Sequence, residues 1–360
     1  MATNEELKKL LLEEMSLANE VRQIGPRAWD APTSRHANAW LRLYVDMASS
    51  QLPGEPVPGN TIVQPGVRIF YRGQSNTTWK PTPTLYRIPP EERPLASHAT
   101  SIMAAVVDSI YSEAWGSPGA EDWPHLMSSA GYAAARHYGL RTTLLDWTVN
   151  PQTAIYFATT DKAPDGAPPK GAVYWLEDVA AEAYGLKVVL APPTLRRLYL
   201  QRGFFTDMQE SQIEPLSTAG GRIEFPNHPK VNVQAINPNT LALIDVDVYP
   251  EDTWLAALAK WSEAKASALH GSPIDGKALA EEFIASHGRY PEFDQFLANG
   301  PGTARWMFDA VKDFVDQLTL LHGRGGRKCH SPRMMNVLRA TNKLFFDWAA
   351  SHRMEFPECP

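Results

Sequence analysis

The chain has 360 residues, of which 44% are hydrophobic, and this is enough apolar material for one large core or two smaller ones. Its formal net charge of −6 excludes a general attraction to nucleic acid or anionic membranes, so a polyanion site must be a local basic patch. Its two cysteines, Cys329 and Cys359, exclude a disulfide scaffold and a cysteine-based zinc site. No segment has the roughly 18 consecutive apolar residues of a membrane helix, and the polar N-terminus lacks a signal-peptide region. We therefore expect a soluble cytoplasmic protein that does not bind a membrane.

The first part of the chain predicts a helical cap. Apolar residues recur at helical spacing over residues 5–24 and again over residues 34–49, which predicts two helices. The four prolines and three glycines between residues 52 and 67 predict a loop. We therefore place an N-terminal helical region at residues 1–58.

The next segment predicts a strand followed by helices. Residues 67–71 favour a strand that carries Arg72 at its C-terminal end, and Gly73 would allow another backbone to approach closely. Helices are expected at residues 96–115 and 122–136.

Residues 136–158 combine polar side chains with a predicted helix. The apolar pair Leu144-Leu145 predicts the end of a strand, and Asn150 and Pro151 suit the N-cap and first turn of a helix. The polar residues 146–148 lie between the strand and the helix. Backbone N–H groups at such turns often bind phosphate, because the start of a helix favours negative charge.

The rest of the chain changes from strands to helices near residue 250. Strands are predicted at residues 171–176, 186–190, 231–236 and 241–246. Helices are predicted at residues 254–269, 276–285, 301–321 and 335–350. We therefore expect a central domain at residues 59–249 and a helical region at residues 250–360.

Three motifs resemble those of the FRG domain, a bacterial and phage family named for a Phe-Arg-Gly motif. The first is Tyr71-Arg72-Gly73-Gln74 followed by Trp79. The second matches at His137-Tyr138-Gly139-Leu140, Thr142, Leu144 to Thr148, Asn150-Pro151 and Tyr156-Phe157-Ala158. The third lies at residues 196–206, and the resemblance covers about residues 60–245. The chain departs from the family pattern at Arg136, Arg141 and Thr143, where Gln, Pro and Arg are usual.

The order of these motifs also resembles the ADP-ribosyltransferases of the Arg-Ser-Glu class. This resemblance implies an α+β fold with an ADP-ribosyltransferase-like mixed sheet flanked by helices, NAD as the substrate, and no metal. It gives Arg72 the role of binding the NAD phosphate or ribose, since a guanidinium matches a pyrophosphate with two hydrogen bonds. Thr148, assisted by Asp146, takes the role of stabilising the pocket.

The catalytic carboxylate of that class has no clear counterpart. Gln201 stands near the position where a transferase presents Gln-x-Glu, and a neutral amide cannot give the same electrostatic stabilisation as a carboxylate. Gln201 is still expected to hydrogen-bond the ribose. Asp146, Glu177 and Glu224 remain open as substitutes.

The resemblance implies a set of NAD-binding residues: Tyr71, Arg72, Gly73, Gln74, His137, Tyr138, Trp147, Thr148 and Asn150. Several of them have an equally ordinary structural interpretation. His137 is either an acid, base or ribose ligand, or a hydrogen-bonded structural residue. Trp147 and Tyr71 either stack on the nicotinamide or adenine, or pack in the core.

Two hypotheses about function follow. In the first, the protein is an NAD-dependent toxin or effector, in phage defence, that transfers ADP-ribose to a nucleic acid or protein and is paired with an antitoxin. In the second, it is a non-catalytic module that recognises a nucleotide, a nucleic acid or a partner protein. The basic residues 323–328 either contact nucleic-acid phosphates or form a solvated loop between helices.

Overall fold

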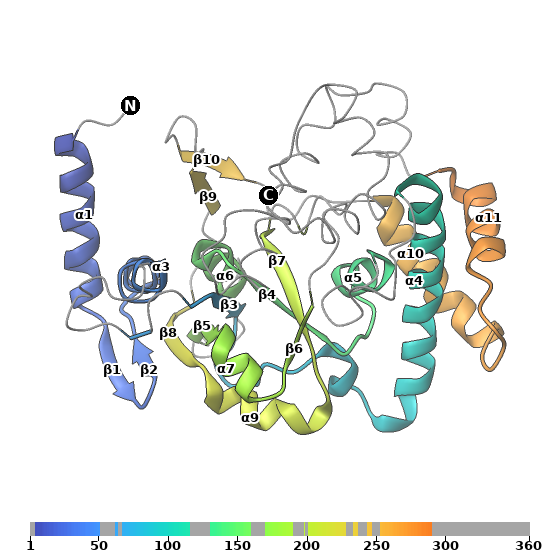
Figure 1. The fold of residues 1–360 in the computed structure, drawn as a ribbon, viewed down its shortest axis with the longest axis horizontal. Coiled ribbons are helices and arrows are strands. Elements are labelled where there is room, and N and C mark those ends of the chain that lie inside the picture. The colour runs from blue at the N-terminus through green and yellow to red at the C-terminus, as the bar shows by residue number, and fades with distance from the viewer. Residues whose placement is uncertain are drawn as a thin grey trace, which may run out of the picture. The chain divides into compact units, whose positions relative to one another are not determined.

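The computed structural model describes residues 4–50, 62–63, 67–115, 130–159, 170–189, 198, 201–227, 233–236, 243–246 and 253–289. The chain divides into two compact units (Figure 1). The first unit comprises residues 1–82, 145–188 and 200–249, and the second comprises residues 83–144, 189–199 and 250–360. The helices predicted at 301–321 and 335–350, the basic loop at 323–328 and most of the loop predicted at 52–67 lie outside the described residues.

A mixed sheet forms the centre of the first unit. Its described strands have the order β1-β2-β8-β5-β3-β4-β7-β6. They are β1 Arg22–Gly25, β2 Ala28–Asp30, β3 Ile69–Gln74, β4 Leu144–Thr148, β5 Lys170–Glu177, β6 Lys187–Val189, β7 Gly203–Asp207 and β8 Gly221–Pro226. Strands β2 and β8 pair in parallel, whereas the pairs β1–β2, β8–β5, β5–β3 and β3–β4 are antiparallel. The predicted α+β class, with a mixed sheet flanked by helices, is therefore confirmed.

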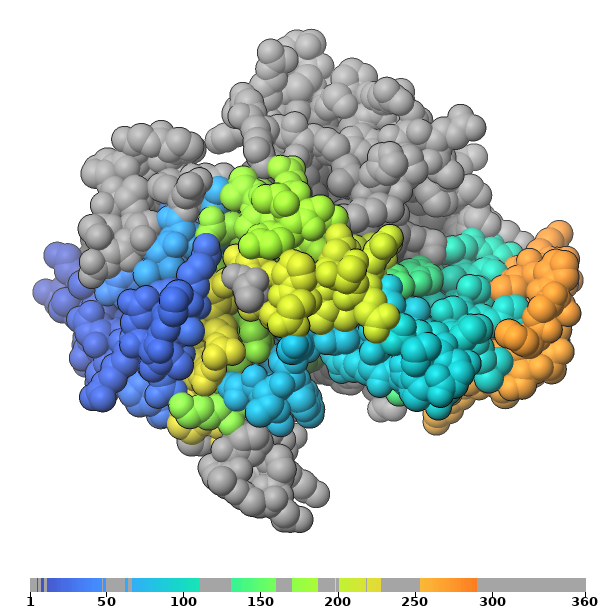
Figure 2. Space-filling model, turned by 90° about the horizontal axis from the view of Figure 1, so that it is seen from below, coloured from blue at the N-terminus to red at the C-terminus, as the bar shows by residue number. Residues whose placement is uncertain are grey.

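Helices and a separate pair of strands complete the first unit. The helices are α1 Asn4–Asn19, α2 Ser34–Leu41, α3 Met47–Ser50, α6 Pro151–Ala158, α7 Asp178–Ala183 and α9 Ile213–Ala219. The strands β9 Val233–Ile236 and β10 Leu243–Val246 form a separate antiparallel pair. The space-filling view shows the N-terminal residues directly beside those of β8, as expected from the β2–β8 pairing (Figure 2).

Helices α2 and α6 pack on one face of the sheet. Three tryptophans from different elements meet there, with ring centroids 4.8 Å apart for Trp29 and Trp40, 5.2 Å for Trp29 and Trp175, and 5.5 Å for Trp40 and Trp175. Large aromatic side chains contribute much of the apolar area that a core buries. This cluster therefore ties the N-terminal segment to the central strand β5.

The predictions for the N-terminal segment need one correction. The helix predicted at residues 5–24 ends at Asn19, and residues 22–25 form strand β1 instead. Helical spacing alone extended the helix too far, because pairing with β2 outweighs the local preference of this segment. The second predicted helix is present as α2 and α3, joined by the π-helical turn Arg42–Asp46.

Asp46, at the end of the π-helical turn, is a partly buried acid. Burial raises the pKa of its carboxyl group, and the charges of Arg42 and Arg202 and the nearby Tyr71 hydroxyl only partly oppose this rise. The native state therefore holds this proton more tightly than the unfolded chain does. The associated stability is fully present below about pH 3.8, the ordinary value, and is lost as the pH rises through the folded pKa.

We predict that Asp46→Asn weakens this loss of stability with rising pH. The amide does not titrate, so the free energy of unfolding should fall less between pH 4 and 7 than in the unmodified protein. The difference should reach about 1.4 kcal/mol for each unit by which the pKa is raised. Urea unfolding at a series of pH values measures it. Identical pH profiles for the two proteins would show that Asp46 does not titrate above its ordinary range.

Helices make up the described part of the second unit. They are α4 Arg93–Trp115, α5 Ala130–His137, α10 Thr253–Ala268 and α11 Gly276–His287, and α4 packs against the other three. The predictions for α4, α10 and α11 are confirmed, whereas residues 122–129 of the predicted helix at 122–136 lie outside the described residues. Across the described residues of both units, no helix combines the length and apolar character needed to cross a membrane.

Candidate functional site

Strands β3, β5 and β8 carry polar side chains on the face of the sheet opposite α6. Arg72 pairs with Tyr174, and Tyr174 pairs with Arg222. Directly paired residues of antiparallel strands point to the same face, so these three side chains form one row. The next row along the same strands consists of Gln74, Ala172 and Glu224. We call the polar members of the two rows, Arg72, Gln74, Tyr174, Arg222 and Glu224, the polar face.

Two ion pairs hold the cations of the polar face. Arg72 is only 7% exposed, and its Nη1 donates to the Asp146 carbonyl oxygen at 2.7 Å and lies 2.8 Å from Asp146 Oδ2. Arg222 is more accessible, and its Nη2 lies 3.0 Å from Glu224 Oε1. Burying a charged group is costly unless it has a partner, so the ion pair with Asp146 stabilises the buried Arg72.

Gln74 has an unsatisfied acceptor on the polar face. Its Nε2 donates to the Lys80 carbonyl oxygen at 3.3 Å, but its buried Oε1 has no hydrogen-bond partner among the described residues. Leaving a buried acceptor unpaired costs about 1 to 3 kcal/mol. The Oε1 atom therefore keeps the capacity to accept a hydrogen bond.

Tyr174 is a hydrogen-bond donor in the centre of the first row. Burial raises the pKa of its phenol. The charge of Arg222 and a hydrogen bond with Arg222 oppose this rise, whereas the charge of Glu224 adds to it. The phenol therefore stays protonated at neutral pH, and it donates to the Trp79 carbonyl oxygen at 3.4 Å.

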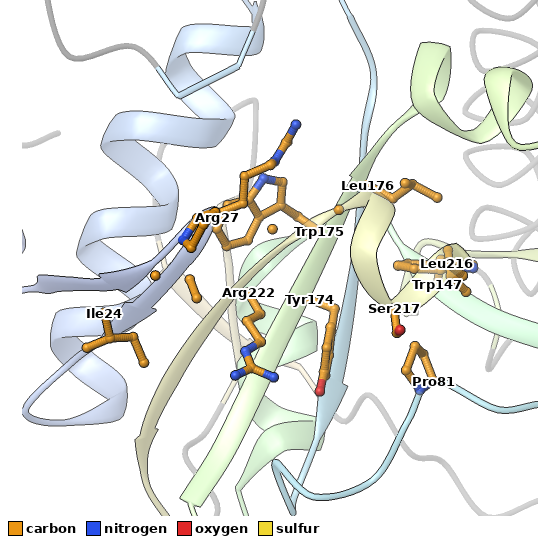
Figure 3. A pocket seen from close by; sticks show the side chains of 15 residues that line it. Ile24, Arg27, Pro81, Trp147, Tyr174, Trp175, Leu176, Leu216, Ser217 and Arg222 are labelled. Carbon is orange, nitrogen blue, oxygen red and sulfur yellow. The ribbon is translucent and has the colours of Figure 1, made fainter. Parts of the chain in front are cut away.

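A pocket of about 430 Å³ lies beside the polar face (Figure 3). Tyr174 and Arg222 belong to its lining and lie next to each other in the close view, together with Trp147, Pro81 and Leu216. The turn between β1 and β2 supplies a further part of the wall. Among the described residues that line the pocket, none is acidic, and apolar side chains predominate. Such a pocket fits a flat ring next to an anionic group.

Trp147 is the predicted stacking residue that reaches this pocket. It is buried, and its Nε1 donates to Thr206 Oγ1 at 3.0 Å. This hydrogen bond fixes the orientation of the indole, so one part of the ring surface is presented to the pocket in a defined position.

Thr148, Gln201 and Asn150 hold the backbone around the end of β4. Thr148 Oγ1 donates to the Gln201 carbonyl oxygen at 2.6 Å and accepts from the Asn150 backbone N–H at 3.0 Å. The Asn150 side chain accepts from the Gln152 backbone N–H at 2.9 Å and so caps α6, as predicted. Thr148 pairs with Tyr71, which places both on the face that carries α6 rather than on the polar face.

The remaining predicted residues lie elsewhere. Tyr71 is fully buried in the core beneath α6, and the backbone of Gly73 lies directly against α6. Asp146 is the partner of Arg72. His137 and Tyr138, at the end of α5, belong to the second unit, where the Tyr138 N–H donates to the Ala134 carbonyl oxygen at 2.9 Å. Arg72, Gln74 and Trp147 are therefore the predicted residues found on or beside the polar face.

Strand β8 supplies site residues that the sequence did not single out as a set. Its residues Arg222, Ile223, Glu224 and Phe225 alternate between polar and apolar, which is the pattern of a strand with one polar face. That signal was sufficient to place Arg222 and Glu224 on the same side. Tyr174, within the predicted strand at 171–176, became a candidate only through its pairing with Arg72. The described residues contain no cluster of three or more potential metal ligands.

Comparison with known proteins assigns the motif region. Residues 67–166 match the FRG domain family, a range that includes β3, β4, α4, α5 and α6. Neither the curated proteins nor the solved structures gave a match. The matched range contains Arg72, Gln74 and Trp147, whereas Tyr174, Arg222 and Glu224 follow it in the chain. The motifs and the match together identify residues 67–166 as an FRG domain.

Proposed function

We propose that the protein binds NAD at the polar face and transfers its ADP-ribose group to an acceptor. The observation that carries this proposal is the convergence of Arg72, Tyr174, Arg222 and Glu224 on one side of the sheet, beside a pocket with aromatic walls. An arginine, a carboxylate and ring surfaces are the groups that NAD glycosidic chemistry requires. The proposal includes an ADP-ribosyltransferase-like arrangement of the mixed sheet.

Three side chains of the polar face have direct roles in this chemistry. Arg222 binds the pyrophosphate, because it lines the pocket and is accessible enough to exchange its carboxylate partner for a phosphate. Gln74 Oε1 accepts a hydrogen bond from a ribose hydroxyl. Glu224 polarises the ribose 2′-hydroxyl and stabilises the positive charge that develops at C1′.

The reaction breaks the bond between C1′ of the ribose and the nicotinamide nitrogen, and the electron pair leaves with nicotinamide. The nucleophilic atom of the acceptor forms the new bond to C1′ and releases its proton to water. The carboxylate of Glu224 matters most while C1′ carries positive charge, since an interaction that strengthens only in the transition state accelerates the reaction.

The proposal changes the roles that the family resemblance implies. Arg72 is buried and held by Asp146, so it joins β3 to β4 and contributes positive charge to the site rather than binding phosphate directly. Glu224 takes the place of the carboxylate that Gln201 cannot supply. Among the other open candidates, Asp146 is the partner of Arg72, and Glu177 lies 2.6 Å from Arg27.

The first test is release of nicotinamide from NAD by the purified protein, alone and with cellular RNA, DNA or protein added. We predict time-dependent release by the unmodified protein. In the Arg222→Lys variant, the KM for NAD should rise roughly ten- to a hundred-fold. Lysine keeps the charge but loses the two-pronged geometry, and one hydrogen bond to a charged group is worth about 1.5 to 3 kcal/mol. No release under any condition, together with no thermal stabilisation by NAD, would contradict the proposal.

A second candidate function is a non-catalytic recognition module. The observation that favours it is that both arginines of the polar face already have carboxylate partners, so the charges are balanced without a ligand. NAD binding without nicotinamide release would support this alternative. The toxin and phage-defence roles, the antitoxin and the class of acceptor stay predictions that follow from the transferase proposal.

A further inference from the structure

Trp79 is a large aromatic side chain that the fold leaves in solvent. It is 54% exposed, whereas Trp29, Trp40, Trp147 and Trp175 are all buried. Burying a tryptophan normally stabilises a protein by removing a large apolar area from water. Its exposure therefore leaves a ring surface available for contact with another molecule.

The loop that carries Trp79 is held by local hydrogen bonds. Asn76 Oδ1 accepts from the backbone N–H of Thr78 at 2.9 Å and from its hydroxyl at 2.8 Å. The backbone N–H of Trp79 donates to the Asn76 carbonyl oxygen at 3.2 Å. The backbone N–H of Thr77 donates to the carbonyl oxygen of Lys170, in β5, at 2.9 Å. These bonds fix the backbone on both sides of the indole, so little ordering is needed when a ligand stacks on it.

The same loop is attached to the polar face. Tyr174 donates to the Trp79 carbonyl oxygen, and Gln74 donates to that of the next residue, Lys80. Pro81 lines the pocket, and Figure 3 shows it in the part of the pocket where the Tyr174 hydroxyl lies. Trp79 itself does not line the pocket, whereas Pro81, two residues later in the same loop, does.

The neighbouring charges suit a nucleotide. Lys80 is bonded to Glu214 with Nζ 2.5 Å from Oε2, and both side chains are mostly in solvent. Surface ion pairs of this kind contribute about 0 to 1 kcal/mol, so Lys80 can exchange its carboxylate for a phosphate at little cost. A flat nitrogen ring on an exposed indole beside a lysine is the usual arrangement for a stacked nucleobase.

We propose that Trp79 is a stacking platform for a nucleobase at the entrance of the polar face. The base has two sources, the adenine of NAD or a base of a single-stranded nucleic acid that the protein binds. The first source rests on the proposed function, whereas the second holds for a catalytic protein and for a recognition module alike.

The experiment measures binding by the whole chain and compares Trp79→Leu with Trp79→Phe. Tyr184→Leu serves as the matched control, since Tyr184 is also exposed, at 42%, and lies at the C-terminal end of α7. The probes are NAD, nicotinamide mononucleotide, which has no adenine, a single-stranded ten-nucleotide RNA or DNA, and an abasic strand of the same length. Calorimetry measures the binding of NAD and of nicotinamide mononucleotide. Fluorescence anisotropy of labelled strands measures the binding of the nucleic acids.

We expect Trp79→Leu to weaken binding of NAD or of the base-bearing strand roughly ten- to a hundred-fold, and Trp79→Phe to restore most of it. Nicotinamide mononucleotide and the abasic strand should bind equally to all variants, and the melting temperature should not change. A loss confined to NAD identifies adenine, and a loss confined to the strand identifies a base of a bound nucleic acid. Unchanged affinity for both ligands, or an equal loss for the abasic strand, would overturn the inference. Nicotinamide release is scored separately, so failure of the transferase proposal remains distinguishable.

Discussion

Replacing Glu224 by Gln is expected to reduce the rate of nicotinamide release roughly a hundred- to a thousand-fold, with little change in stability. The amide has the size and shape of the carboxylate, but it carries no charge to stabilise the cation that develops at C1′. Removing one well-aimed electrostatic group from an active site typically costs about 3 to 4 kcal/mol in the barrier. Single-turnover measurement of nicotinamide release at saturating NAD isolates this effect from binding.

Glu177→Gln is the matched control for this experiment. Glu177 is also a buried glutamate in an ion pair with an arginine, Arg27. Because side chains alternate along a strand and Glu177 lies three residues after Tyr174 in β5, Glu177 points to the opposite face. We expect its replacement to leave nicotinamide release unchanged. If Glu177→Gln abolished release and Glu224→Gln did not, the catalytic carboxylate would lie outside the polar face.

Gly73→Ala is expected to destabilise the first unit by an amount at or above the upper end of the usual range of about 1 to 3 kcal/mol for overpacking. A Cβ atom at this position would lie 1.9 Å from the carbonyl oxygen of Ala154 and 2.7 Å from the backbone nitrogen of Ala158. Both atoms belong to the backbone of α6, so no side chain can move aside to make room. Urea or thermal unfolding measures the change.

Gly25→Ala provides the comparison for this prediction. A Cβ atom at Gly25 would approach only Ala28 Cβ, at the ordinary contact distance of 3.7 Å, so its effect on stability should be small. The pair of variants also separates two interpretations of the Gly-containing motif. A Gly73→Ala protein with unchanged stability but no NAD binding would mean that the close approach at Gly73 is to a ligand and not to α6.

The sequence by itself determined the match of residues 67–166 to the FRG domain family and the local elements. The Arg72 motif and residues 136–158 identify the FRG domain without any knowledge of the fold. Asn150 and Pro151 predicted the start of α6, because N-caps and first-turn prolines act within a few residues. The apolar run at 171–176 likewise predicted β5, and the spacing over 96–115 predicted α4. Each of these signals depends only on neighbours in the chain.

Only the tertiary structure decided which side chains share the site. Strand β2 has three residues and β1 has four, too few to show a periodicity, and the pairing of β8 with β5 joins segments far apart in the sequence. That pairing places Glu224 on the same face as Arg72, whereas pairing with Tyr71 places Thr148 on the face of α6. Motif spacing cannot predict these outcomes, because the register between distant strands, which sets the face of every side chain, is a property of the folded sheet.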